Sequence, residues 1–373
     1  MEIPKRKFES LIKRTSPILP SFRTAKDEFL GRFIFTEDGV FIFSENAFIH
    51  IKSRYFGSKR LIVHSKGIDS ILPAVKGKLV NCEVKLDSAG QGNLFVKDKG
   101  KTVNAKFSIE NKEEIFSVAD SFVSNISSLK WRKLPECFVE GAEACSSTTN
   151  RIGLTETHRK YHCLYLCGDS LLSADGHRLS SYSLGCDLSR AVFSGGVVNG
   201  LRAGTLRRFS EDKAWLYFAD SKKDFIFAAR KFDFEVFDYD KVLKSRSGQK
   251  IVFFANDTPI IEAVSSPISG DATAPLEYVS IKIDRGNVFY KGEHSTGWVE
   301  GKSKVKNKEG NLQFAISTKY FLEALKRFSR KEDGGCRAVV NLKLGRAYFK
   351  LGNLQQVVML MRKEKAKRRK VLR

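Results

Sequence analysis

Two stretches decide the fold of this chain: Ala174-Asp175-Gly176-His177-Arg178-Leu179 and Val357-Val358-Met359-Leu360-Met361-Arg362. Each combines apolar side chains with a few hydrogen-bonding groups, as a surface that holds another protein's peptide does. Two of the three methionines lie in the second stretch, and their flexible thioethers suit a site with several partners. The two stretches together predict the walls of a partner-binding pocket. Taken alone, the second is also compatible with a closing core strand.

The bulk composition predicts a multi-domain protein with a polyanionic partner. The chain has 373 residues, 42% of them hydrophobic, which is enough for two or three domains. Its formal net charge is +23, from 65 lysines and arginines against 42 acidic residues. Such an excess most often means nucleic acid. Residues 363–373 carry seven basic side chains and Glu364, so most of the excess lies elsewhere.

The cysteines and the apolar runs predict a protein of the cytoplasm, with no membrane, metal or cofactor. The seven cysteines are odd in number and lack paired C-x-x-C spacing, which favours reduced thiols. We expect Cys163 and Cys167 to pack within a strand rather than to bind a metal. No apolar run has membrane-spanning length, and the amino terminus lacks a secretory signal.

Hydrophobic periodicity predicts a unit of helix, strands, helix and strands that occurs three times, an α+β fold. The first unit has helices at 8–15 and 68–75 and strands at 29–36, 40–43, 48–51, 61–64, 80–86, 93–97 and 102–107. The second has helices at 135–145 and 197–201 and strands at 161–167, 179–183, 215–219 and 225–230. We expect linkers near 120–133 and 244–249. The predicted domains are 1–125, 126–246 and 247–363, followed by a basic tail at 364–373.

The third unit has the clearest helix signals. It starts with a strand at 250–254, after which Asn256 or Asp257 is the expected N-cap of a helix with Pro259 in its first turn. Ser317 or Thr318 is the expected cap of the second helix. The buried stripe of that helix comprises Phe321, Leu322, Leu325 and Phe328.

Basic residues opposite the buried stripes of several helices predict sequence-independent contacts to DNA phosphates. Any one such helix is also compatible with an ordinary solvated face, and the first helix of the second unit carries Glu136, Glu140 and Glu143 instead of cations. The candidate DNA contacts are Lys13, Arg14, Arg23, Lys66, Arg151, Arg159, Lys160, Tyr161, Arg202, Lys319, Lys326 and Arg327.

The sequence gives no catalytic motif. Asp175 and His177 lie near Ser173 and Ser180, but residues two apart on a strand share a face and do not form a nucleophile, base and orienter line. A phosphate-binding G-x-x-x-x-G-K-[ST] loop is also missing from the sequence. We therefore expect a protein that is not an enzyme.

Four landmarks resemble one family, the bacterial-type sliding clamp, which is the beta processivity factor of replicative DNA polymerases. Residues 174–179 are similar to its Thr-Asp-Gly-His-Arg-Leu motif, and 236–243 to Phe-Pro-Asp-Tyr-x-x-Val-Leu. Residues 317–325 resemble Asn-x-x-Tyr-Leu-x-x-x-Leu, and 357–362 resemble Val-Val-Met-Pro-Met-Arg. A weaker match, residues 28–31, resembles Pro-Ile-Leu-Gly.

The resemblance implies a head-to-tail homodimer of three-domain subunits, closed into a ring around duplex DNA with helices lining the hole. It also implies a peptide cleft between the second and third domains, where a DNA polymerase and a clamp loader dock short motifs. The location would be the cytoplasm, at the nucleoid, or the host cytoplasm for a viral source. By this matching the cleft residues are Ala174, Gly176, His177, Arg178, Leu179, Phe237, Lys241, Val242, Ser317, Tyr320, Val357, Met359, Leu360, Met361 and Arg362.

The chain also departs from the family pattern. Phe237 and Leu360 replace two prolines, and Ala174 replaces a threonine, so a bulkier cleft with a different peptide preference is expected. The segment 364–373 extends beyond the usual end of the family. It is expected to contact DNA, to favour acidic peptides, or to be a disordered charged tail. The high net charge also leaves open a monomeric, basic nucleic-acid-binding accessory protein with a clamp-like fold that forms no closed ring.

Overall fold

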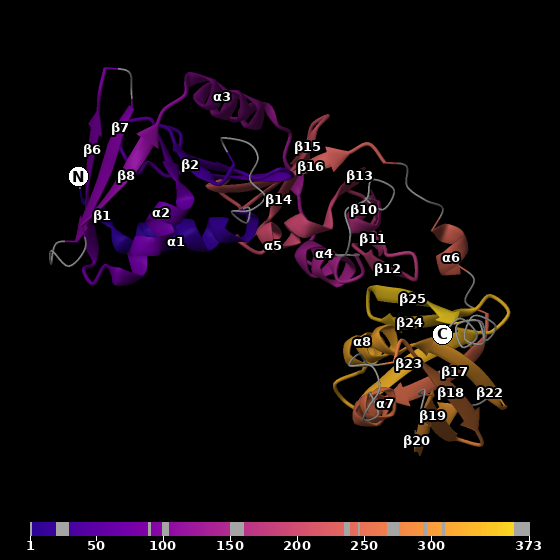
Figure 1. Cartoon of the computed structure of the whole chain (residues 1–373). Helices are drawn as coiled ribbons and strands as arrows, with labels where there is room; N and C mark the ends of the chain where they lie inside the picture. Colours follow the sequence, from indigo (N-terminus) through magenta and orange to yellow (C-terminus); the bar gives the residue numbers. More distant parts are fainter. Residues whose placement is uncertain are drawn as a thin grey trace, which may run out of the picture. The chain divides into compact units, whose positions relative to one another are not determined.

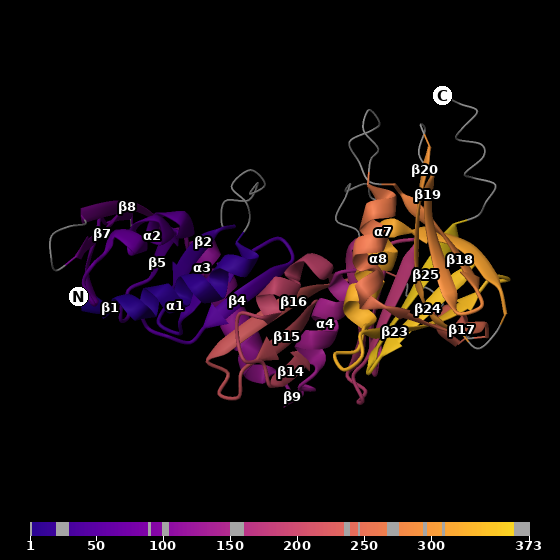
Figure 2. The same ribbon diagram turned by 90° about the horizontal axis from the view of Figure 1, so that it is seen from below.

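The computed structural model shows two compact units, each described by itself (Figures 1 and 2). Unit 1 contains Met1–Glu143 and Ala191–Phe234, and unit 2 contains Ala144–Arg190 and Glu235–Arg373. The predicted domain 126–246 is therefore divided between the two units, and the three-domain division stays a prediction. The structure describes residues 2–19, 30–88, 91–98, 104–149, 160–234, 239–244, 247–266, 276–293, 297–307 and 310–361.

Unit 1 is built on one antiparallel sheet. Its strand order is β1 (Glu2–Pro4), β6 (Leu79–Leu86), β7 (Gln91–Asp98), β8 (Asn104–Glu110), β5 (Leu61–His64), β2 (Arg32–Phe35), β3 (Val40–Phe43), β4 (Ala47–Ile51), β16 (Phe225–Phe232), β15 (Trp215–Ala219), β14 (Arg208–Glu211) and β9 (Arg132–Lys133). β13 (Ser189–Ser194) pairs with the end of β16 through Val192 and Phe193. The central strands are almost wholly buried, because helices cover both faces of the sheet.

Helices lie on the two faces of this sheet (Figure 1). One face carries α1 (Lys5–Thr15), α2 (Ser65–Ile71) and α5 (Val198–Leu201). The short helices beside them are η1 (Ser16–Ile18), which contacts α1 and α5, η2 (Leu72–Ala74), which contacts α2, and η4 (Gly195–Val197), which contacts α5. α3 (Glu113–Ser128) covers the other face and packs Phe116 and Phe122 over a cluster that includes Phe48. α4 (Phe138–Ser146) packs Phe138 against Phe218 of β15.

Helix α3 shows that the predicted linker at 120–133 is wrong. Its apolar residues recur at helical spacing from Ile115 to Ile126, and they pack on the sheet. The serines between them resemble a linker in composition, whereas the periodicity is that of an amphipathic helix. The predicted boundary between residues 125 and 126 lies inside α3.

Unit 2 contains two antiparallel sheets that share β25 (Leu354–Met361). The first has the order β10 (Cys163–Gly168), β11 (Ser170–Ala174), β12 (Arg178–Ser183), β25, β24 (Arg346–Leu351), β23 (Gly335–Asn341), β17 (Gln249–Phe254) and β21 (Lys306–Asn307). The second continues from the end of β25 through β22 (Leu312–Ser317), β18 (Tyr278–Asp284), β19 (Asn287–Glu293) and β20 (Trp298–Lys304). β25 thus connects the two sheets.

Two helices of unit 2, α7 (Thr258–Ser265) and α8 (Thr318–Phe328), begin where the sequence signals predict them. The short η5 (Ala255–Asp257) precedes α7, and α6 (Asp240–Lys244) is a helix that the sequence analysis does not predict. Asp257 is the N-cap residue of α7, but its buried carboxylate accepts hydrogen bonds from Tyr290 and Ser303, each at 2.6 Å. Phe321 of α8 packs edge-on against Phe253, with ring centroids 5.1 Å apart. The α+β fold class and most predicted elements are confirmed, although Leu322 is only half-buried.

Among the described helices, none combines the length and the apolar character that a membrane crossing needs.

His50 is a histidine buried in the sheet of unit 1. It lies on β4, is 5% exposed, and stacks on Phe41 at 4.2 Å. Its Nε2 is 3.3 Å from the Asp38 carbonyl oxygen, while its Nδ1 has no partner among the described residues. Burial lowers the pKa of His50 from 6.5 to about 4.

We predict that His50 weakens the fold in acid. The unfolded chain takes up a proton near pH 6.5 and the folded chain only near pH 4, so stability is present above pH 6.5 and is lost as the pH falls through that window. Between pH 7 and pH 4.5 the loss should be about 2 kcal/mol. Urea unfolding of His50→Gln should lack this part of the loss, whereas the exposed His64→Gln should keep it. Equal acid sensitivity in both variants would contradict the prediction.

Candidate functional site

The pairing of β12 with β25 brings the two decisive stretches together. Arg178 pairs with Val358, and Leu179 pairs with Val357, in an antiparallel register. Asp175, Gly176 and His177 form the turn between β11 and β12, with Gly176 at φ 87°. The expectation that Asp175 and His177 share one face of a strand is therefore wrong, because both residues lie in this turn.

Four of the predicted cleft residues lie in one apolar cluster, here called the apolar patch. Ala174, Leu179 and Val357 form its buried base together with Tyr348, and Val242 of α6 packs on it while half-buried. The other half-buried members are Tyr161, Tyr239, Leu243 and Val339. The patch thus combines aliphatic side chains with three tyrosines, of which Tyr348 is buried and Tyr161 and Tyr239 are half-buried.

The remaining described cleft candidates lie around the turn and at the end of β25. Met359 and Met361 are 39% and 37% exposed, and Leu360 is half-buried. The backbone N–H of Met359 donates to the His177 carbonyl at 2.9 Å, which ties β25 to the turn. His177 and Lys241 are exposed. Ser317 is the N-cap residue of α8, and Tyr320 lies in its first turn, while Phe237 and Arg362 lie outside the described residues.

Sequence reasoning missed several patch residues. Tyr348 and Val339 belong to β24 and β23, strands for which no landmark is present. Tyr161 was assigned to DNA, yet it lies in the apolar patch. The exposed Leu342 and Leu344 lie outside the patch, in the β23–β24 turn, where the Leu360 N–H donates to the Gly345 carbonyl. The only sequence signal for these residues is the alternation of each strand, which becomes informative once the strand order is known.

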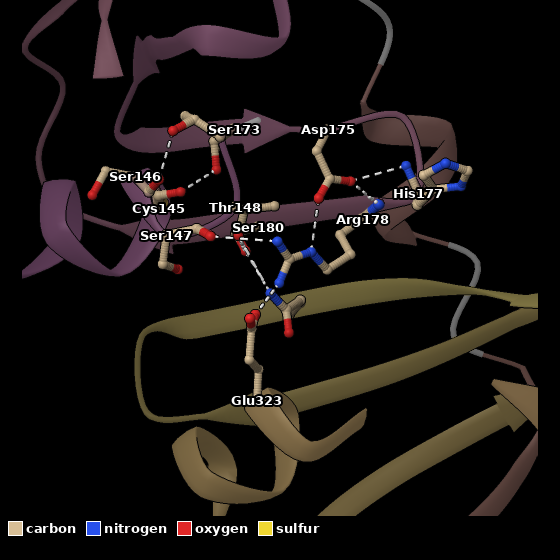
Figure 3. A network of polar contacts seen from close by, with 12 residues as sticks. Cys145, Ser146, Ser147, Thr148, Ser173, Asp175, His177, Arg178, Ser180 and Glu323 are labelled. Carbon is tan, nitrogen blue, oxygen red and sulfur yellow. Dashed lines mark hydrogen bonds and ion pairs between the residues drawn. The ribbon is translucent and has the colours of Figure 1, made fainter. Parts of the chain in front are cut away.

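Arg178 is the centre of a polar network behind the turn (Figure 3). Its Nε donates to Asp175 Oδ2 at 2.9 Å, its Nη1 donates to Glu323 of α8, and its Nη2 donates to the Ser147 carbonyl at 3.4 Å. The guanidinium also lies 4.0 Å from the centre of the Tyr320 ring. The side chains of Arg178 and Asp175 are 4% and 5% exposed. Arg178 therefore lies behind the surface, where it forms a buried ion pair with Asp175.

Hydrogen bonds between uncharged side chains extend the network around Arg178. Thr148 and Ser180 share a hydrogen bond of 2.5 Å, and Gln356 Nε2 donates to the Ser180 hydroxyl at 3.1 Å. Ser173 donates to the Cys145 carbonyl at 2.6 Å (Figure 3). Burial raises the pKa of the Cys145 thiol to about 12, so this thiol is protonated and unreactive at neutral pH. These contacts fix β11, β12 and β25 to the end of α4.

Charges on α8 adjoin the same network. Arg327 is half-buried and donates to the Ala144 carbonyl at 3.1 Å. Burial lowers the pKa of Arg327, while the nearby Glu323 carboxylate acts in the opposite direction. Burial and the Asp175 carboxylate raise the pKa of Tyr320, which keeps its hydroxyl neutral.

The candidate DNA contacts of unit 1 lie on α1 and just after α5. Lys13 is exposed in the last turn of α1, and the Arg14 guanidinium lies 5.5 Å from the Phe225 ring centre. Arg202 is exposed and pairs with Glu143 at 2.8 Å. α5 packs against η1, which directly follows α1, since a Cβ on Gly200 would lie 2.8 Å from Ile18 of η1.

The candidates of unit 2 divide between exposed and engaged residues. Lys160, Lys319 and Lys326 are exposed, and the Lys160 ammonium lies 5.3 Å from the Tyr161 ring centre. Arg327, by contrast, is committed to the Ala144 carbonyl. Arg23, Arg151 and Arg159 lie outside the described residues, and so do the Lys66 side chain and the tail 364–373.

Among the residues that the structure describes, no group of histidine, cysteine and acidic side chains has the arrangement of a metal site. Cys163 is buried on β10 and Cys167 is half-buried, and burial raises their pKa values to about 12 and about 11.

Among known proteins, the chain matches solved structures but no family model or curated sequence. The DNA polymerase III beta subunit of Thermotoga maritima is similar in structure with 16% identity and a TM-score of 0.73, covering 97% of this chain and 98% of that one. The Pseudomonas aeruginosa beta subunit has 13% identity and a TM-score of 0.75, covering 97% and 99%.

A third structure, the sliding clamp of Bartonella birtlesii bound to griselimycin, has 12% identity and a TM-score of 0.77, covering 97% and 99% of the two chains. Identities this low show the fold alone. The chain therefore has the fold of the DNA polymerase III beta sliding clamps over nearly its whole length, as the four landmarks predict.

We predict that Arg178→Ala destabilises unit 2 by about 3 kcal/mol, because it leaves the buried Asp175 carboxylate without its cation. Urea unfolding followed by circular dichroism measures this change. Arg330→Ala is the matched control, since the Arg330–Asp333 pair is 32% and 38% exposed and should contribute less than about 1 kcal/mol. A similar small loss in both variants would contradict the prediction.

Proposed function

We propose that this chain is a DNA sliding clamp, a processivity factor without enzymatic activity that acts in the cytoplasm on replicating DNA. It encircles duplex DNA and tethers a polymerase and a clamp loader through short peptides bound at the apolar patch. The observation that carries the proposal is the β12–β25 pairing within a whole-chain clamp fold, because it places the two decisive stretches side by side.

Ring closure requires a second copy, and the sheet edges suggest how that copy pairs. β20 pairs with β19, and no pairing on its other side is present among the described residues. β8 pairs with β7 along its length, whereas its ladder pairing with β5 is confined to Ile109 and Val63. Open edges invite pairing with another chain, and Trp298 on β20 is 62% exposed. We infer a head-to-tail homodimer in which β20 of one subunit pairs with β8 of the other.

Contact with DNA rests on charge. The exposed lysines of α1 and α8 would meet phosphates, which carry no sequence information, so the ring holds the duplex while remaining free to slide. The net charge of +23 attracts DNA to the molecule as a whole, in addition to the attraction by these lysines.

The same net charge supports a second candidate, a monomeric nucleic-acid-binding accessory protein with this fold that forms no closed ring. A monomer would hold DNA through charge alone, so it would leave circular and linear DNA at the same rate. Oligomeric state and topology therefore separate the two candidates.

We predict that the loaded protein stays on circular plasmid and leaves the same plasmid after linearisation, because only a linked ring depends on DNA ends. Light scattering should show a dimer, and Trp298→Asp should give a monomer that no longer distinguishes the two DNAs. Equal retention on both DNAs by the unaltered protein, together with a strict monomer at micromolar concentration, would favour the accessory protein.

We predict that the apolar patch and the end of β25 bind short peptides. A peptide selected from a random library on the unaltered chain should bind Val242→Asp and Met359→Asp about tenfold more weakly, because each variant places a charge where an apolar side chain docks. Leu86→Asp is the control, since Leu86 has the exposure of Met359 but lies in unit 1. Peptides that ignore both patch variants would contradict the proposal.

A further inference from the structure

We propose that Glu323 is a positioning residue: from α8, outside the apolar patch, it fixes the turn Asp175–His177 through Arg178 and thereby sets the geometry of the partner-binding surface. The part that concerns peptides rests on the proposed function. The part that concerns the turn rests on the contacts alone.

A chain of hydrogen bonds leads from Glu323 to the turn (Figure 3). Glu323 accepts from Nη1 of Arg178, and Arg178 Nε donates to Oδ2 of Asp175 at 2.9 Å. The other carboxylate oxygen of Asp175 accepts the backbone N–H groups of His177 and Arg178 at 2.9 and 2.7 Å. The carboxylate that shapes the turn is thus oriented by a guanidinium that Glu323 holds from the opposite side.

The turn Asp175–His177 determines the positions of two parts of the surface. The His177 carbonyl accepts the N–H of Met359 at 2.9 Å, where β25 leaves its pairing with β12. Leu179, in the base of the apolar patch, directly follows Arg178. A shift of the turn therefore moves Met359 and Leu179 together.

The charges explain why Glu323 is needed. Arg178 is buried, and a guanidinium with one carboxylate partner can satisfy only part of its fork of donors. Glu323 supplies the second carboxylate, and the nearby Arg327 offsets the additional negative charge. Glu323 is 37% exposed, so Glu323→Gln leaves its own side chain in contact with water, and Arg327 keeps the Ala144 carbonyl as its acceptor. Loss of this charge should loosen the turn without unfolding unit 2.

Arg178 thus has an indirect role at the surface. The resemblance places Arg178 in the wall of the cleft, whereas each of its three guanidinium nitrogens donates a hydrogen bond within unit 2, to Asp175, Glu323 and Ser147. Arg178 acts on a bound peptide through the turn rather than by direct contact.

Hydrogen exchange of the full chain tests the inference on the turn. Glu323→Gln should speed exchange at the amides of His177, Arg178 and Met359 about tenfold, as loss of a charge-assisted hydrogen bond implies. Asp333→Asn is the matched control, because it removes a carboxylate of 38% exposure from the Arg330 pair in the same unit. Unchanged exchange at the three amides in Glu323→Gln would overturn the inference.

Peptide binding tests the consequence separately. With the library-selected peptide as probe, Glu323→Gln should weaken binding about tenfold, while thermal unfolding and retention on circular DNA stay as in the control. Arg178→Lys removes the planar guanidinium that contacts both carboxylates. Adding Glu323→Gln to this variant should therefore weaken peptide binding little further. Equal peptide affinity in Glu323→Gln and the unaltered chain would overturn the inference and leave the proposed function intact. Faster amide exchange in a chain whose unaltered patch binds no peptide would support the positioning role and reject the proposed function.

Discussion

The antiparallel register of β12 and β25 is the constraint on which the rest of unit 2 depends. It sets Leu179 opposite Val357, so that both side chains enter one apolar cluster, and it sets the turn beside Met359. Since side chains alternate between the faces of a strand, a slip of β25 by one residue would turn Val357 away from Leu179 and from the cluster. The buried Ser180 and Gln356 add to this specification, because their hydrogen bond forms only in one register.

The polar contacts behind the surface divide the basic residues of unit 2 into two groups. Arg178 of β12 and Arg327 of α8 donate to carboxylate or carbonyl groups within the unit. Lys319 and Lys326, which also lie on α8, are exposed. The helix thus presents charge on one side and anchors the turn on the other. A buried arginine with a planar fork suits the second task, and a hydrated lysine suits the first.

The sequence predicts the elements of this fold well where apolar periodicity is regular, as in α8 and in the buried strands β3 and β4. The resemblance to the clamp family also predicted Ala174, Leu179 and Val357 as parts of one site, and the three residues lie in one cluster. The solved clamp structures are only 12% to 16% identical to this chain, so they show its fold alone. Tyr348 and Glu323 were missed, because their roles come from neighbours far apart in sequence. Helix α3 was missed for another reason: its serines obscured a regular apolar repeat.

The position of β25 in the chain has a consequence for biosynthesis. Val358 pairs with Arg178, a residue made much earlier, and contacts of such long sequence separation form late in folding. Until the ribosome releases residues 354–361, β12 has an open edge and Leu179 lacks its cover. A nascent chain that lacks β25 therefore has an incomplete apolar patch, because Val357 is missing from its base.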